Sequence, residues 1–63
     1  MKQATKNYRQ FESDDHIFQL DRIQDFFFQE TYFAVWDVIG DYYETFDTLG
    51  EAERDFNRVI AEV

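Results

Sequence analysis

Hydrophobic and polar positions divide the chain into segments of different character. Residues 1–12 are polar, basic and weakly patterned, which is typical of a flexible arm or of a short edge strand around Tyr8–Phe11. Residues 14–27 carry apolar side chains at helical spacing, and we expect a helix there. Its apolar face would hold His16, Ile17, Leu20, Ile23 and Phe27. The competing interpretation is a strand through Ile17–Ile23, for which the alternation is poorer.

The residues just before this segment favour a helix start. Ser13 has a hydroxyl that can cap free backbone amides, and it is followed by Asp14 and Asp15. Carboxylates in a first turn suit the positive end of the helix dipole. The first predicted helix therefore begins near residue 14.

Residues 31–47 are typical of a β-hairpin. From Thr31 to Ile39, aromatic and β-branched residues favour extended backbone, and both faces of the run are largely apolar. We therefore expect an inner strand that is covered on both sides or paired in a dimer. Gly40 and Asp41 break the run, and Tyr42–Asp47 forms the second strand.

Two registers are open for this hairpin. A turn at Gly40–Asp41 would set Asp37 opposite Glu44, and like charges in direct opposition destabilise a sheet. A turn at Ile39–Gly40 would instead produce these pairs: Asp37 with Tyr42, Trp36 with Tyr43, and Phe33 with Phe46. We favour the second register, although isoleucine is poorly suited to the positive φ of a tight turn. A bulged turn would relieve both difficulties.

The C-terminal segment predicts a helix over residues 49–62. Thr48 and Glu51 have the spacing of a capping box, with Thr48 as N-cap and Glu51 reaching back. The apolar positions form one stripe for packing on the hairpin: Leu49, Ala52, Phe56, Val59, Ile60 and Val63. The expected fold is a small α+β domain in the order helix–hairpin–helix (αββα). In it, a basic arm (residues 1–12) precedes an acidic domain (residues 13–63).

The size and composition of the chain favour self-association. A core built from 63 residues rarely supplies more than about 3–5 kcal/mol, and the chain has no cysteine for a disulfide. It is nevertheless rich in large apolar side chains, with eight Phe, four Tyr and one Trp. More aromatic surface is present than so small a core easily encloses. We therefore expect a homo-oligomer, most simply a dimer, or a partner that covers the surplus.

Charge restricts the class of partner. The chain has 14 acidic residues against six Lys and Arg, for a net charge of −8, and every acid falls from Glu12 onward. Such a body repels nucleic acid and anionic membranes and attracts basic proteins. With no apolar leader, no lipidation motif and no cysteine, we expect a cytoplasmic protein that contacts neither membrane nor nucleic acid directly.

Residues suited to catalysis or to metal binding are few. His16 is the only histidine and Ser13 the only serine, and their placement in one turn leaves no independent oxyanion site. The chain lacks a Gly-rich phosphate loop. Acids spaced to share a divalent cation occur on both expected helices: Asp21 with Asp25, and Glu51 with Asp55. Such pairs are usually solvated, so we expect no metal, no cofactor and no enzymatic activity.

The strongest candidate site is the acidic surface of the expected helices. On the first helix, Phe18 lies within a stripe of carboxylates, and an apolar anchor ringed by charge is typical of a protein-binding hot spot. On the second, acids recur along one line that Arg58 interrupts. The predicted partner-binding residues are Asp14, Phe18, Asp21, Asp25, Glu51, Asp55 and Glu62. Carboxylates about 6 Å apart along a helix are spaced comparably with the charges of duplex DNA.

We therefore expect a non-enzymatic inhibitor that mimics DNA and blocks a basic nucleic-acid-binding site. In size, acidity and lack of catalytic groups, the chain is similar to small phage-encoded anti-CRISPR and anti-restriction proteins. This similarity implies a target among nucleic-acid-handling enzymes in the host cytoplasm. Tyr32–Val63 also resembles a hairpin–helix unit found in many small proteins, which indicates fold and not activity. Two alternatives stay open: a dimeric antitoxin-like regulatory protein, and a structural domain whose acidity serves only solubility.

Overall fold

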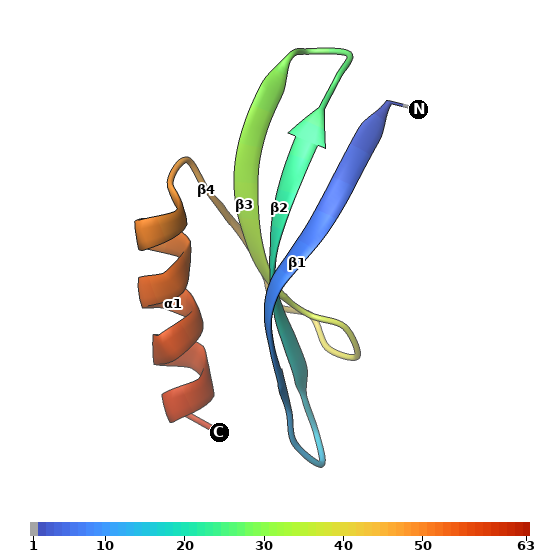
Figure 1. Ribbon diagram of the computed structural model, residues 1–63. Coiled ribbons are helices and arrows are strands. Elements are labelled where there is room, and N and C mark those ends of the chain that lie inside the picture. Colours follow the sequence, from blue (N-terminus) through green and yellow to red (C-terminus); the bar gives the residue numbers. More distant parts are fainter. Residues whose placement is uncertain (1) are drawn as a thin grey trace.

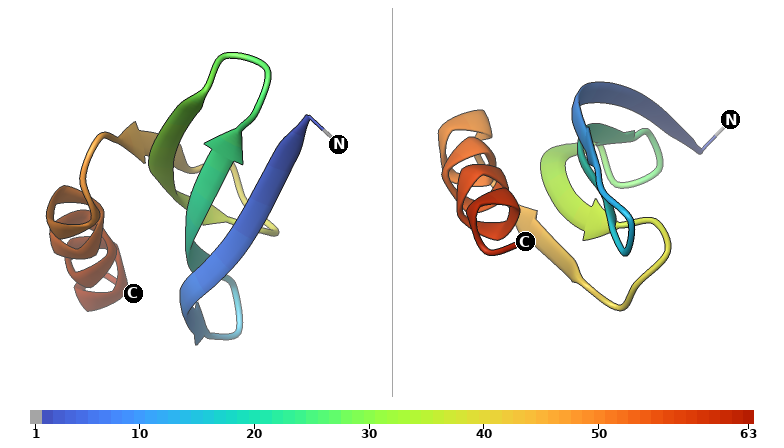
Figure 2. Two further views of the ribbon diagram at one scale, coloured as in Figure 1. Left: turned by 45° about the horizontal axis from the view of Figure 1, so that its top comes forward. Right: turned by 90° about the horizontal axis from the view of Figure 1, so that it is seen from below.

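The protein is a four-stranded antiparallel sheet with one helix on one of its faces (Figure 1, Figure 2). The computed structural model describes residues 2–63. The elements in chain order are β1 (Gln3–Glu12), β2 (Ile17–Asp25), β3 (Glu30–Asp37), β4 (Tyr43–Phe46) and α1 (Leu49–Ala61). The strands lie side by side in their sequence order, so each pair of neighbours is joined by a turn.

The expected helix over residues 14–27 is wrong, and with it the αββα order. Its residues form β2 instead, which pairs with β1 on one side and β3 on the other. Phe18 and Leu20 point to the helix-covered face, while Ile17 and Ile23 lie on the opposite face. A strand that is apolar on both faces loses its period-2 signal, and the remaining spacings then match a helix.

The Ser13–Asp15 segment is a turn and not a helix start. The backbone N–H of Ser13 donates to the carbonyl of His16 at 2.8 Å, closing the β1–β2 connection. Residues that cap helices also favour turns, because their short polar side chains bond to nearby backbone. Of the two alternatives for the N-terminal segment, the edge strand is the one found, and it extends over Gln3–Glu12.

The β3–β4 hairpin has the favoured register. Trp36 pairs with Tyr43 and Phe33 with Phe46, and the Asp37 N–H donates to the Tyr42 carbonyl at 2.9 Å. The connection is longer than a two-residue turn, and no glycine in residues 2–63 has a positive φ. The longer turn removes the need for a positive φ at Ile39.

The C-terminal helix is confirmed, together with its cap. Thr48 has extended backbone angles, and its hydroxyl oxygen accepts from the Glu51 N–H at 3.2 Å. The Glu51 side chain reaches back to the same hydroxyl, 2.9 Å away. This reciprocal contact fixes where α1 begins, and α1 then runs across the sheet beside β2, β3 and β4.

The core lies between α1 and one face of the sheet. Buried apolar side chains from both elements meet there: Phe18, Leu20 and Val35 from the sheet, and Ala52, Phe56 and Val59 from the helix. Val63, the last residue of the predicted stripe, is exposed. The opposite face of the sheet has no covering layer among residues 2–63 (Figure 2), although neighbouring side chains bury Asp21 and Ala34 on it. The helix of 13 residues is not long and apolar enough to span a membrane.

Candidate functional site: an aromatic tip beside an acidic hollow

The most exposed apolar feature is the turn between β2 and β3. Phe26, Phe27 and Phe28 are consecutive there, and 49%, 70% and 68% of their surfaces are exposed. We call these three residues the Phe tip. The turn projects beyond the N-terminal end of α1, so the helix does not cover it (Figure 1). Burial of a Phe side chain contributes about 1.5–3 kcal/mol, and the Phe tip forgoes most of this contribution in the isolated chain.

Asp25 fixes the backbone of the Phe tip. One Asp25 carboxylate oxygen accepts from the N–H of Phe27 at 3.0 Å and of Phe28 at 3.2 Å. Gln29 closes the turn with φ of 54°, and the Phe26 N–H donates to the Lys2 carbonyl at 2.9 Å. A turn organised in advance loses less conformational entropy when it binds. The backbone of the Phe tip is therefore ordered before any partner binds.

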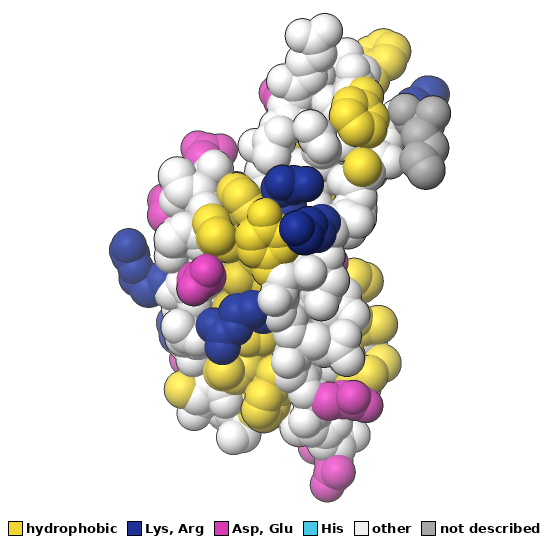
Figure 3. All heavy atoms as spheres, viewed as in Figure 1, with side chains coloured by type: hydrophobic (Ala, Val, Ile, Leu, Met, Phe, Trp, Pro, Cys, Tyr) yellow, Lys and Arg dark blue, Asp and Glu magenta, His cyan; other side chains and the backbone are white. Residues whose placement is uncertain are grey.

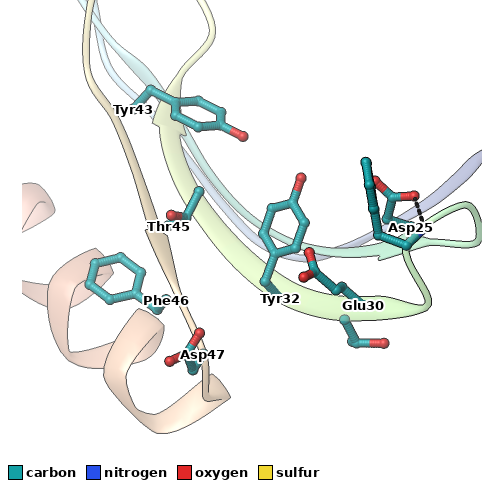
Figure 4. A pocket seen from close by; sticks show the side chains of 9 residues that line it. Asp25, Glu30, Tyr32, Tyr43, Thr45, Phe46 and Asp47 are labelled. Carbon is teal, nitrogen blue, oxygen red and sulfur yellow. Dashed lines mark hydrogen bonds between the residues drawn. The ribbon is translucent and has the colours of Figure 1, made fainter.

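A hollow of about 770 Å³ adjoins the tip along β3 and β4 (Figure 4). Carboxylates stand around it: Asp25, Glu30 and Asp47. Its remaining lining is Phe28, Thr31, Tyr32, Tyr43, Thr45 and Phe46. We call this region the acidic hollow. Aromatic rings beside carboxylates suit the long side chain of Lys or Arg, whose stem is apolar and whose head is cationic.

Tyr43 of the acidic hollow remains neutral at physiological pH, because its pKa is raised. Burial raises the pKa of Tyr43, and the nearby Tyr32 and Asp21 raise it further. The hydroxyls of Tyr32 and Tyr43 point into the hollow from the sheet (Figure 4). Neutral hydroxyls can donate as well as accept, so the hollow offers hydrogen bonds besides its negative charge. No cluster of three metal-ligating side chains occurs within residues 2–63.

The uncovered sheet face also contains a buried carboxylate. Asp21 is 4% exposed, although α1 packs on the other face. Its two oxygens accept from the indole Nε1 of Trp36 at 2.7 Å and from the amide of Asn7 at 2.8 Å. These bonds satisfy the carboxylate without a cation, and they tie β1, β2 and β3 together across the face.

The predicted site residues of the first segment do not form a stripe. Phe18 is buried against α1, and Asp21 is buried on the other face of the sheet. Asp14 lies in the β1–β2 turn, whereas Asp25 lies at the far end of β2. The predicted stripe is therefore wrong: these residues do not share one face, because alternate residues of a strand point to opposite faces. Only Asp25 belongs to the site described above.

The acids of α1 are largely occupied within the protein. Arg58 pairs with Asp55 at 2.8 Å and with Glu62 at 3.2 Å. Asp55 also accepts from the hydroxyl of Tyr42, and burial together with this bond raises the pKa of Tyr42 to about 12. Asp55 and its hydrogen bond raise the pKa of Arg58 as well. Glu51 bonds to its own N-cap. These acids of α1 are therefore less available to a partner than the sequence analysis predicted.

A carboxylate–imidazole pair lies at the opposite end of the sheet. His16 Nδ1 is 2.6 Å from Asp37 Oδ2, and the other Asp37 oxygen accepts from the N–H of Ile17 and of Ile39. The ring of His16 also stacks on Phe18, with centroids 5.1 Å apart. The hydroxyl of Ser13 lies against the His16 carbonyl and not against its ring. These bonds connect the start of β2 to the β3–β4 turn.

Sequence reasoning missed the Phe tip, Glu30 and Asp47. In the expected helix, Phe27 falls on the core face, and Phe26 and Phe28 are given no role. The available signal was their run: three consecutive aromatic residues cannot all point to one face of a helix or a strand. Comparisons with protein-family models, with curated proteins and with solved structures find no match.

Proposed function

We propose that the protein is a non-enzymatic binding module that docks on a basic site of another protein. The observation that carries this proposal is the Phe tip, an ordered group of exposed aromatic side chains between Asp25 and Glu30. Large apolar anchors supply most of the binding energy of an interface, and surrounding charges supply orientation and speed of association. In the proposed complex the tip enters an apolar pocket of the partner.

The acidic hollow supports a basic partner. Its three carboxylates would pair with Lys or Arg side chains that reach along the rings of Tyr32 and Tyr43. The net charge of −8 adds long-range attraction to a basic surface and repels nucleic acid. Binding through the first-segment stripe is not part of the proposal, because that stripe does not exist.

A nucleic-acid-handling enzyme is the class of partner that we propose. Such enzymes present basic residues that bind the phosphates of nucleic acid, and the carboxylates of the acidic hollow would pair with these residues in place of phosphate. The complex would form in the cytoplasm, or in the host cytoplasm if the gene belongs to a phage. In that setting the protein would inhibit its target by competing with nucleic acid.

Paired variants test the proposed surface. Phe27→Ser with Phe28→Ser removes two anchors of the Phe tip. Val38→Ser with Ile39→Ser is the matched control, because these side chains are 41% and 58% exposed in the turn at the other end of the sheet. Tagged wild type and both variants are used to capture proteins from a lysate of the organism that carries the gene. Captured proteins are then purified, and their binding rates are measured.

Specific outcomes support or contradict the proposal. A basic partner should be retained by wild type and by the control, and lost by the Phe-tip variant. Converting Glu30 and Asp47 to Gln and Asn should slow association and flatten its salt dependence, because exposed charges act through a screened field. Nucleic acid should compete with the protein for the partner. Equal binding by the two Ser variants would place the interface elsewhere.

A further inference from the structure

Most of the cations outside α1 gather in one place. Lys6, Arg9 and Arg22 lie on the helix-side face of β1 and β2, at the edge that α1 leaves open. Figure 3 shows dark blue side chains bordering a hydrophobic strip between the helix and β1. We call these three residues the cationic cluster. The cluster is unexpected in a chain with more than twice as many acids as cations.

A β-bulge creates the cluster. Asn7 pairs with Asp21 and Arg9 with Leu20, so Tyr8 is an extra residue in β1. If Tyr8 instead paired regularly with Leu20, Arg9 would pair with Gln19 and point to the face opposite Lys6. With the bulge, Tyr8 contacts Phe33, and the guanidinium of Arg9 lies 4.6 Å from the ring centre of Phe56. Bulges often redirect side chains at functional sites.

The opposite face of the sheet braces this bulge. The amide of Asn7 donates to the Arg9 carbonyl at 3.0 Å and to Asp21 at 2.8 Å. Trp36 holds the other oxygen of Asp21. On the helix side, Arg9 donates to the Asn57 side chain at 2.8 Å. The guanidinium is thus fixed by neutral groups and retains donors for a ligand.

The cluster is costly to the isolated chain. Lys6 and Arg22 stand directly opposite each other, and like charges in this position destabilise a sheet. None of the ion pairs among residues 2–63 involves Lys6, Arg9 or Arg22. The sequence has 14 acids, yet none of them forms an ion pair with these cations among residues 2–63. An external anion would relieve the repulsion.

We propose that the cationic cluster binds the phosphate group of a small phosphorylated ligand. Guanidinium groups match the oxygens of phosphate in a two-bond geometry, and Lys6 adds a compact third charge. A phosphate carries up to two negative charges and meets three cations, whereas a single carboxylate would leave two of them unneutralised. A long polyanion is disfavoured by the overall charge of −8. This site is separate from the Phe tip and does not depend on the proposed function.

One carboxylate, that of Glu53, borders the cationic cluster and would weaken phosphate binding there. Glu53 lies one helical turn before Asn57 on α1, so it shares the side of the helix that Arg9 approaches. It is half-buried and forms none of the ion pairs among the described residues. Glu53→Gln should therefore strengthen phosphate binding by removing a nearby negative charge.

The test is an NMR titration at constant ionic strength. Inorganic phosphate and a nucleoside monophosphate are added in separate arms, and the signals of the Arg side chains and of the backbone are followed. Arg22→Gln removes one cation of the cluster. Arg54→Gln is the matched control, because it makes the same change of charge on an exposed part of α1. Thermal unfolding of each variant, with and without phosphate, gives a second readout.

Wild type should show saturable shifts centred on Lys6, Arg9 and Arg22. Arg22→Gln should weaken binding about ten-fold or more, because a hydrogen bond between ionised groups contributes about 1.5–3 kcal/mol. Arg54→Gln should change it less than about two-fold. Tighter binding in one arm identifies the ligand as free phosphate or as a nucleotide. Equal weakening by both variants, or shifts spread evenly over the surface, would overturn the proposal. So would an equal rise in melting temperature in wild type and Arg22→Gln, since phosphate stabilises many proteins nonspecifically.

Discussion

His16 Nδ1 lies 2.6 Å from Asp37 Oδ2, and this contact joins the start of β2 to the end of β3. The hydrogen bond to His16 holds the pKa of Asp37 below its ordinary value of 3.8, with help from the N–H groups of Ile17 and Ile39. Burial of the carboxyl opposes this effect without reversing it. The charged form of Asp37 therefore stabilises the fold.

The pH dependence of stability follows from that direction. A group with a depressed folded-state pKa contributes stability above its unfolded pKa, and the contribution is lost as the pH falls toward its folded pKa. We expect the free energy of unfolding to fall below about pH 4, and to fall less steeply in Asp37→Asn. Urea unfolding between pH 7 and pH 2 measures this difference. Asp41→Asn is an exposed control from the same turn, and an acid slope in Asp37→Asn equal to that of wild type would contradict the assignment.

Gly40 is required by the position of Asp37. A Cβ atom at residue 40 would lie 2.4 Å from Asp37 Oδ2, well inside contact distance. Gly40→Ala should therefore destabilise the protein by about 1–3 kcal/mol, as overpacking does. Gly50, in the first turn of α1, has nothing within 4 Å of its Cβ position. Gly50→Ala should stabilise by up to about 1 kcal/mol through helix propensity. Thermal melts that rank the two variants in the opposite order would refute this reading of the turn.

The network around Asp21 should contribute to stability from the uncovered face. Trp36→Phe keeps an aromatic ring but removes the indole N–H that donates to Asp21. Loss of a hydrogen bond to a buried charged group costs about 1.5–3 kcal/mol. Asp21→Asn in the Trp36→Phe background should recover part of this loss, because a neutral amide is less costly to leave unpaired. Chemical denaturation of both single variants and of the double variant measures the coupling. Additive effects would show that the two side chains do not interact.

Local rules predicted the C-terminal half of the fold. The Thr48–Glu51 spacing located the helix start, and the repulsion between Asp37 and Glu44 selected the register that pairs Trp36 with Tyr43. Both features depend on neighbouring residues or on one adjacent strand. Such rules therefore suffice where a contact is short in sequence.

The N-terminal half depends on contacts that local rules do not contain. Ile17, Leu20 and Ile23 fit one face of a helix, yet they lie on two faces of a strand that is held between β1 and β3. The predicted site failed for the same reason, since Phe18 and Asp21 share a stripe only on a helix. The cationic cluster depends on a one-residue bulge, and no pattern in β1 announces that bulge.

The C-terminal helix supplies the strongest test of the core. Phe56 is 1% exposed and contacts the sheet, so Phe56→Ala should cost about 3–5 kcal/mol. Thr48→Ala removes the N-cap and should cost about 1 kcal/mol. Phe28→Ala is the control, because Phe28 is 68% exposed and its loss should change stability little. Melting temperatures compare the three variants, and an unchanged value for Phe56→Ala would mean that α1 does not close the core.

Self-association stays a prediction, and the uncovered sheet face is where we expect it. This face carries Tyr32, Trp36 and Tyr43 together with Ile23, and no element within residues 2–63 packs over them. A second copy could bury these rings, and sedimentation over a range of concentrations should show a dimer at micromolar protein. Ile23→Lys places a charge in the centre of the face and should shift the equilibrium to monomer without unfolding the chain, whereas Val38→Lys should not. Because Tyr32 and Tyr43 also line the acidic hollow, a basic partner and a second copy would compete for the same surface. Adding the partner should therefore dissociate the dimer. A chain that remains a monomer at all concentrations would leave this aromatic surface to the partner alone.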